Sequence, residues 1–162
     1  MNAKEITMKR STIAKAFTIA AVTALALGIA PTAKAQGCSG LSLNGTFAYK
    51  GTGTIVSPAA MAGPIDEVGT LTFNGSDIVT GAGVINQGGT AIPVTKTGTY
   101  TVNPDCTGTI TVQYSLGFTS QFFFVIDSIE AVGIQYVRGS ELQILCEDAG
   151  VVLDGIARRQ MP

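Results

Sequence analysis

The chain of 162 residues contains no histidine and no tryptophan. Histidine is the commonest general base and the commonest metal ligand in proteins, so its absence excludes Ser–His–Asp and Cys–His catalysis. We therefore predict neither a metal site nor a cofactor. Charged residues are also scarce, at 13% of the chain, and those present are unevenly distributed.

Half of the basic residues lie within the first 35 residues, where a single acidic residue accompanies them. The rest of the chain holds five basic and ten acidic residues, which gives it a net charge of −5. Binding to nucleic acid or to an anionic membrane surface usually needs a basic patch. We therefore predict that the protein binds neither.

Residues 1–35 have the three parts of a secretory signal peptide. A basic segment is followed by the uncharged apolar run AFTIAAVTALALGIA and then by AKA, a cleavage signal that ends at Ala35. The apolar run is shorter than the ~20 residues that span a bilayer. We expect a removable signal helix, a single domain over residues 36–162 without a membrane span, and export to the periplasm or the cell exterior.

Helical periodicity is absent after residue 36. Short runs rich in Thr, Val, Ile and aromatic residues instead alternate with the turn signals NGSD, QGG, NPDC, SLG, RGS and EDAG. The predicted strands are Gly45–Val56, Glu67–Phe73, Ile78–Asn86, Ala91–Val102, Gly108–Tyr114, Ser120–Asp127, Glu130–Val137, Glu141–Cys146 and Val151–Arg159.

Most of the predicted connections are hairpin-sized, so successive strands should pair antiparallel. Closing such a meander into a barrel removes both edge strands, and the many Gly-Thr steps permit the bends that a small barrel needs. We therefore predict an all-β, antiparallel up-and-down barrel of eight or nine strands. An outer-membrane barrel is the weaker alternative, because aromatic girdles are missing from the strands.

The sequence NPDC marks a turn that also carries a cysteine. Pro104 occupies the position that a type I turn favours, and Thr alternates with apolar residues on both sides of the turn. We expect this hairpin to be a structural element and not a binding site.

Three cysteines in an exported chain predict one disulfide. In a nine-strand meander Cys38, Cys106 and Cys146 all fall at one end, so topology forbids no pairing. Cys146 shares a strand face with apolar residues and is expected to be a buried free thiol. Cys38 lies in a loose N-terminal segment that a tether would fix, so we predict a Cys38–Cys106 disulfide.

Several segments resemble a family of short exported bacterial β-domain proteins of uncharacterised function. The segments are CSGLSLNGTFAY, EVGTLTFNGSD, TGTYTVNPDCTGTITV, FFFVI and DGIARRQ. The resemblance implies the same Cys38–Cys106 pairing and gives Cys146 no role, since the family usually lacks a third cysteine. In architecture alone the family is similar to lipocalin-like and allene-oxide-cyclase-like small barrels, which assigns no activity.

The first functional hypothesis is a barrel that binds a small apolar molecule in its interior. A packed aromatic core is the simpler interpretation, and an apolar cavity of ~300 Å³ would favour binding. The candidate lining residues are Phe47, Tyr49, Phe73, Tyr100, Tyr114, Phe122, Phe124 and Tyr136.

Two further functional hypotheses come from the sequence. It does not predict the oligomeric state. A surface or matrix protein that acts by association would use the apolar strand QFFFVID. A cyclase-like or isomerase-like enzyme is the less favoured third class. Paired carboxylates are weak catalytic candidates, because Asp66–Glu67 and Glu147–Asp148 are expected in solvated connections at opposite ends of the barrel.

Overall fold

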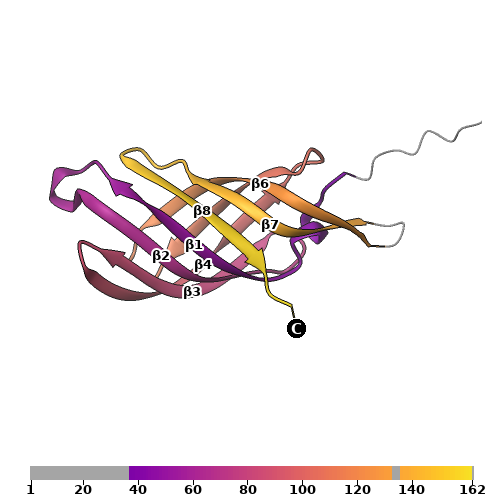
Figure 1. The fold of residues 1–162 in the computed structure, drawn as a ribbon, viewed down its shortest axis with the longest axis horizontal. Coiled ribbons are helices and arrows are strands. Elements are labelled where there is room, and N and C mark those ends of the chain that lie inside the picture. Colours follow the sequence, from indigo (N-terminus) through magenta and orange to yellow (C-terminus); the bar gives the residue numbers. More distant parts are fainter. Residues whose placement is uncertain (1–36, 133–135, 162) are drawn as a thin grey trace, which may run out of the picture. The chain divides into compact units, whose positions relative to one another are not determined.

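The computed structural model describes residues 37–132 and 136–161. These residues form a closed antiparallel barrel of eight strands, in which each strand pairs with the next and the last pairs with the first (Figure 1). The strands are β1 (Gly45–Ile55), β2 (Gly63–Phe73), β3 (Ile78–Gln87), β4 (Thr90–Val102), β5 (Thr107–Tyr114), β6 (Thr119–Val132), β7 (Tyr136–Cys146) and β8 (Val151–Arg159).

Two short 3₁₀ helices, η1 (Gly40–Leu43) and η2 (Ala59–Met61), accompany the strands. Neither of these helices, nor any other in the described part of the chain, is long and apolar enough to cross a membrane. The predicted signal helix and the domain boundary after Ala35 lie outside the described residues.

Alternation of small polar and apolar residues explains why these segments form half-buried strands. In β5, Gly108, Ile110, Val112 and Tyr114 face the interior and are buried, while the intervening residues face outward. The same alternation in β6 buries Phe122, Phe124 and Ile126 on one side. The all-β up-and-down barrel predicted from the sequence is therefore confirmed.

The prediction of a ninth strand is wrong. The segment expected as Ser120–Asp127 lies within β6, which continues to Val132 through register shifts around Ser128. The segment expected as Glu130–Val137 instead begins at the end of β6 and ends at the start of β7. Exposed polar residues at this irregularity resemble a turn in the sequence, whereas a bulge accommodates them within the strand. The expected turn RGS lies inside β7.

Having eight strands moves Cys146 to the other end of the barrel. Chain direction reverses at each strand, so the connections β1–β2, β3–β4, β5–β6 and β7–β8 share one end, which we call the open end. Cys146 ends β7 there, whereas Cys38 and Cys106 lie at the opposite end. The expectation that all three cysteines share an end is therefore wrong.

The helix η1 covers that opposite end, which we call the closed end. Within η1, Ser42 and Leu43 are completely buried. Arg159 at the end of β8 donates hydrogen bonds to the carbonyl oxygens of Ser42 and Asn44, and the Tyr100 hydroxyl donates one to Gly40 O at 3.2 Å. These contacts hold η1 across the barrel end.

Aromatic side chains fill the layer beneath η1. The rings of Phe47 and Phe73 meet edge to face at 5.4 Å between centroids, and those of Phe73 and Tyr100 do so at 5.0 Å. Such pairs add roughly 0.5–1.5 kcal/mol beyond the burial of their surface. The closed end is therefore a packed core.

Candidate functional site

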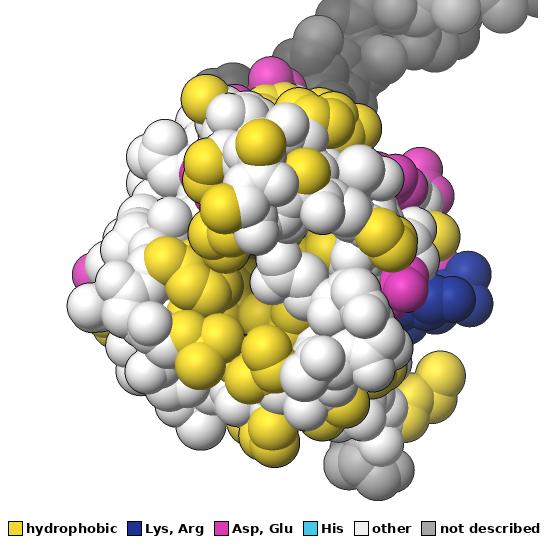
Figure 2. Space-filling view, turned by 90° about the vertical axis from the view of Figure 1, so that its left-hand side faces the viewer, with side chains coloured by type: hydrophobic (Ala, Val, Ile, Leu, Met, Phe, Trp, Pro, Cys, Tyr) yellow, Lys and Arg dark blue, Asp and Glu magenta, His cyan; other side chains and the backbone are white. Residues whose placement is uncertain are grey.

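The open end contains a cavity of about 290 Å³. Figure 2 shows this end, where hydrophobic side chains surround a hollow at the centre. The residues that line the cavity are Ile55, Ser57, Pro58, Met61, Ile65, Glu67, Gln87, Tyr114, Phe118, Thr119, Ser120, Phe122, Cys146, Asp148, Val151 and Leu153. Most of these side chains are apolar, and the described lining includes two carboxylates but neither lysine nor arginine.

Glu67 brings a carboxylate to the wall of the cavity. It lies in β2 with 4% of its surface exposed. The Tyr114 hydroxyl donates a hydrogen bond of 3.1 Å to Glu67 Oε2. The ammonium group of Lys96 forms an ion pair with Glu67 Oε1, and no further hydrogen bond reaches this oxygen from the described residues.

Lys96 lies deeper in the barrel than the cavity and is only 3% exposed. Its strand β4 pairs with β5 so that Lys96 is directly opposite Tyr114. Its Nζ lies 4.9 Å from the ring centroid of Tyr49 and 5.3 Å from that of Tyr114, so both rings face the cation. Burial lowers the pKa of Lys96, and the carboxylate of Glu67 opposes that shift.

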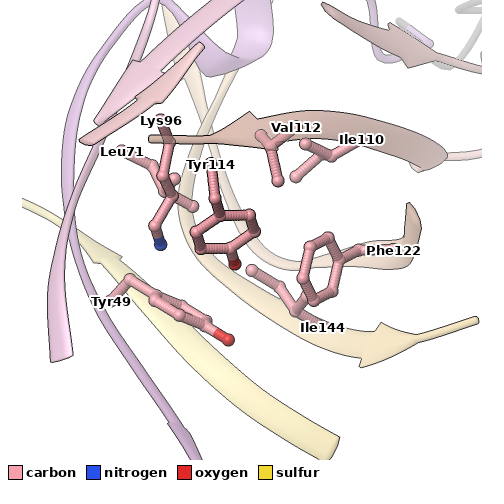
Figure 3. A pocket seen from close by; sticks show the side chains of 8 residues that line it. All are labelled: Tyr49, Leu71, Lys96, Ile110, Val112, Tyr114, Phe122 and Ile144. Carbon is pink, nitrogen blue, oxygen red and sulfur yellow. The ribbon is translucent and has the colours of Figure 1, made fainter. Parts of the chain in front are cut away.

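Tyr49 completes this polar cluster. The side chains of Lys96 in β4 and Tyr114 in β5 extend toward it from across the interior (Figure 3). Its hydroxyl is buried without a hydrogen-bond partner among the described residues, and burial, with Glu67 nearby, raises its pKa. A Cβ at Gly51 would come within 2.2 Å of that hydroxyl, and one at Gly155 within 2.8 Å of the ring. These two glycines leave room for Tyr49.

The interior around the cluster is packed. The space between its side chains is about 10 Å³, which is about enough for a single water molecule. A ligand-sized space is therefore present at the open end and not along the whole barrel. The residues around this small space are Tyr49, Leu71, Lys96, Ile110, Val112, Tyr114, Phe122 and Ile144.

The structure divides the eight aromatic residues predicted from the sequence. Tyr114 and Phe122 line the cavity, and Tyr49 lies below it. The side chain of Tyr136 is outside the described part of the structure. Buried core positions away from the cavity are occupied by Phe47, Phe73, Tyr100 and Phe124.

Sequence reasoning missed the two charged residues of the cluster. Glu67 was expected in a solvated connection, and it is instead buried within β2, which begins at Gly63. The expectation that Glu67 and Asp148 lie at opposite ends is also wrong, because both line the cavity. Alternation contained the signal: Glu67 is two residues from Ile65, and Lys96 is two residues from Val94, each on an apolar strand face.

Cys146 is a free, buried thiol, as predicted. It lines the cavity, and burial is the main cause that raises its pKa to about 11. A thiol with such a pKa is almost fully protonated at neutral pH and is therefore a poor nucleophile.

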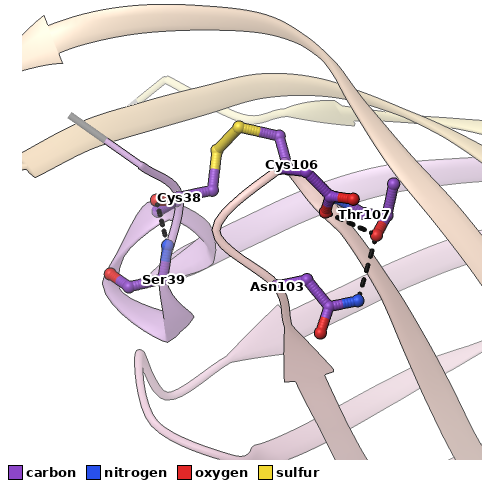
Figure 4. Close-up of a disulfide and its surroundings, with 7 residues drawn as sticks. Cys38, Ser39, Asn103, Cys106 and Thr107 are labelled. Atoms are coloured by element: carbon purple, nitrogen blue, oxygen red, sulfur yellow. Dashed lines mark hydrogen bonds between the residues drawn. A yellow bond between two sulfur atoms is a disulfide. The ribbon is translucent and has the colours of Figure 1, made fainter. Parts of the chain in front are cut away.

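The predicted Cys38–Cys106 disulfide is confirmed at the closed end (Figure 4). Cys106 N donates a hydrogen bond of 3.0 Å to Asn103 O, which closes the expected turn. Cys106 itself has a φ of 67°, a left-handed conformation that favours glycine. Asp105 Oδ1 accepts hydrogen bonds from both the backbone and the hydroxyl of Thr107. Local bonds thus account for each polar residue of the turn.

Comparison with known proteins adds little to this geometry. The chain matches no family model and no curated protein. Among solved structures it is similar to a de novo designed fluorescence-activating β-barrel, with 13% sequence identity and a TM-score of 0.44. That match covers 74% of this chain and 94% of the designed chain, and it has no bearing on function.

Proposed function

We propose that this barrel binds a small, mainly apolar molecule in the cavity at its open end. The observation that carries the proposal is the cavity of about 290 Å³ with a mainly apolar lining. Small-molecule sites typically measure about 300–1,000 Å³ and combine apolar walls with a few polar groups. The cavity lies just below the small end of that range, which favours a compact ligand.

The different construction of the two ends supports this proposal. At the closed end, η1, aromatic packing and a disulfide fix the structure. At the open end, the buried Ser120 leaves space where a larger residue would fill the barrel. The other parts of the hypothesis, namely export, a domain over residues 36–162 and membership of the exported bacterial family, remain predictions from the sequence.

Association through the outer surface is the second candidate function. Val125 in β6 is 38% exposed, and Leu145 in β7 is 51% exposed, so the barrel wall carries apolar side chains on its outside. A protein that acts by association would form assemblies, which measurement of its size in solution would detect. A monomer that takes up ligand would favour the binding proposal.

A pair of substitutions on β6 tests the binding proposal. Ser120 lines the cavity, whereas its neighbour Gln121 faces outward. Ser120→Phe should fill the cavity, and Gln121→Phe adds the same ring to the outer surface as a matched control. Binding of an environment-sensitive apolar dye is measured by fluorescence, and circular dichroism confirms that both variants fold.

We expect Ser120→Phe to weaken dye binding at least about tenfold, because the added ring occupies the ligand volume. Gln121→Phe should leave the affinity within about twofold of the unmodified protein. Equal affinities for both variants would place the dye on the outer surface and contradict the proposal.

A further inference from the structure

We infer that the ligand of this cavity carries a hydrogen-bond donor on an apolar body, as in an alcohol or a primary amine, and that carboxylic acids are rejected. This inference rests on the proposed function and specifies the ligand class of the same site. The observations behind it are the charges on the cavity wall, the position of the buried lysine and the unused acceptor capacity of one carboxylate.

The charge on the described cavity wall has one sign. Glu67 and Asp148 both line the cavity, and neither lysine nor arginine accompanies them there. Asp148 Oδ1 accepts a hydrogen bond of 2.9 Å from the backbone N of Gln121, which holds this carboxylate at the rim. An anionic ligand would have to lose its water and approach two like charges.

Lys96 neutralises part of the charge of Glu67 but presents no cation to a ligand in the cavity. Its amine is already paired with Glu67 and faces the rings of Tyr49 and Tyr114. It lies among the residues around the packed space and does not line the cavity itself. A ligand carboxylate in the cavity would therefore meet Glu67 before Lys96.

Glu67 retains capacity to accept a hydrogen bond. A carboxylate has about four acceptor positions on its two oxygens. Lys96 engages Oε1, and the Tyr114 hydroxyl engages Oε2. Oε1 is fully buried, so a remaining position on Oε2 is the one that suits a donor on the ligand, such as a hydroxyl or an ammonium group. The apolar lining above Glu67 suits the body of the same molecule.

Three ligands with the same chain test this inference: 1-octanol, octylamine and octanoate, each titrated calorimetrically at neutral pH. We expect octanol and octylamine to bind and octanoate to bind at least about tenfold more weakly, because like charges repel in a poorly solvated site. Octanoate binding as tightly as octylamine would overturn the inference while leaving the proposed function standing. Failure of all three ligands, together with failure of the dye, would overturn both.

Two variants separate selection by the site from differences in ligand solubility. The double variant Glu67→Gln with Lys96→Met removes both charges of the buried pair, so that no partner is left unpaired. Asp148→Asn keeps an oxygen for the Gln121 N–H and removes the charge at the rim.

We expect the ratio of octylamine affinity to octanoate affinity to fall at least about threefold in Asp148→Asn, which removes a net negative charge from the wall. The ratio should fall less in the double variant, which removes the Glu67 carboxylate together with the cation that partly neutralises it. Octanol affinity should change little in either protein. If the double variant fails to fold, Asp148→Asn still provides the test. A ratio that stays at its original value would show that these carboxylates do not select the ligand.

Discussion

At the scale of single residues, the buried pair of Glu67 and Lys96 is the least expected feature of this barrel. Two charges with almost no exposed surface lose their hydration, and their attraction must offset that loss. Here the tyrosine hydroxyl and two aromatic rings add to the attraction. Removing one partner leaves the other charge without compensation.

Lys96→Met should therefore lower the free energy of unfolding by about 3–5 kcal/mol, since it leaves a buried carboxylate unpaired. Adding Glu67→Gln to that variant should restore most of the loss. Urea unfolding of the three proteins measures both changes. A double variant as unstable as the single variant would show that the two residues do not act as a pair.

The burial of each residue of this pair can be predicted from the sequence, but their pairing cannot. Alternation in β2 and β4 assigns Glu67 and Lys96 to apolar faces. Their inward-facing positions do not predict that the two residues are in contact, because β2 and β4 are not neighbours in the barrel. Their contact depends on barrel closure and on the space left by small residues such as Gly51.

At the scale of elements, the hairpin between β4 and β5 shows how much a local pattern can predict. The turn residues and the disulfide were predicted because turn geometry and cysteine pairing follow local rules. The left-handed conformation of Cys106 was not predicted. Glycine is the usual residue at such a position, and cysteine occurs here because the disulfide to Cys38 requires it.

Substitutions at Cys106 should separate these two effects. Cys106→Ala should lower the free energy of unfolding by about 2–5 kcal/mol through loss of the disulfide. Cys106→Gly loses the same bond but should be about 1 kcal/mol more stable than the alanine variant, since glycine adopts the left-handed conformation freely.

Equilibrium unfolding in urea without reductant measures this difference, with Cys38→Ala as the control that removes the disulfide and leaves Cys106 in place. Alanine and glycine variants of equal stability would contradict the conformational argument. A reduced protein as stable as the oxidised one would contradict the role of the disulfide.

The failed strand prediction belongs to the same scale. A turn and a bulge both collect polar residues, and only the pairing of β6 with β7 distinguishes them. One extra predicted strand then reversed the direction of the remainder and placed Cys146 and Asp148 at the wrong end. In a meander, one strand too many in the prediction reverses the predicted direction of every strand that follows it.

At the scale of the whole molecule, the barrel combines a packed half with a hollow mouth. The aromatic content of the sequence did not distinguish a packed core from a cavity, because the same residue types fill the closed end and line part of the open end. The difference arises from where η1 packs and from the small polar residues at the rim. Ligand binding at the open end is therefore the central claim.

A nuclear magnetic resonance titration of the labelled protein with 1-octanol tests that claim most directly. Backbone amide signals of Phe118, Ser120 and Asp148 at the open end should shift in proportion to occupancy. Those of Leu43 and Asn103 at the closed end should remain in place. Shifts confined to the open end are the result that ligand binding in the cavity predicts, and shifts confined to the outer wall or the closed end would contradict it.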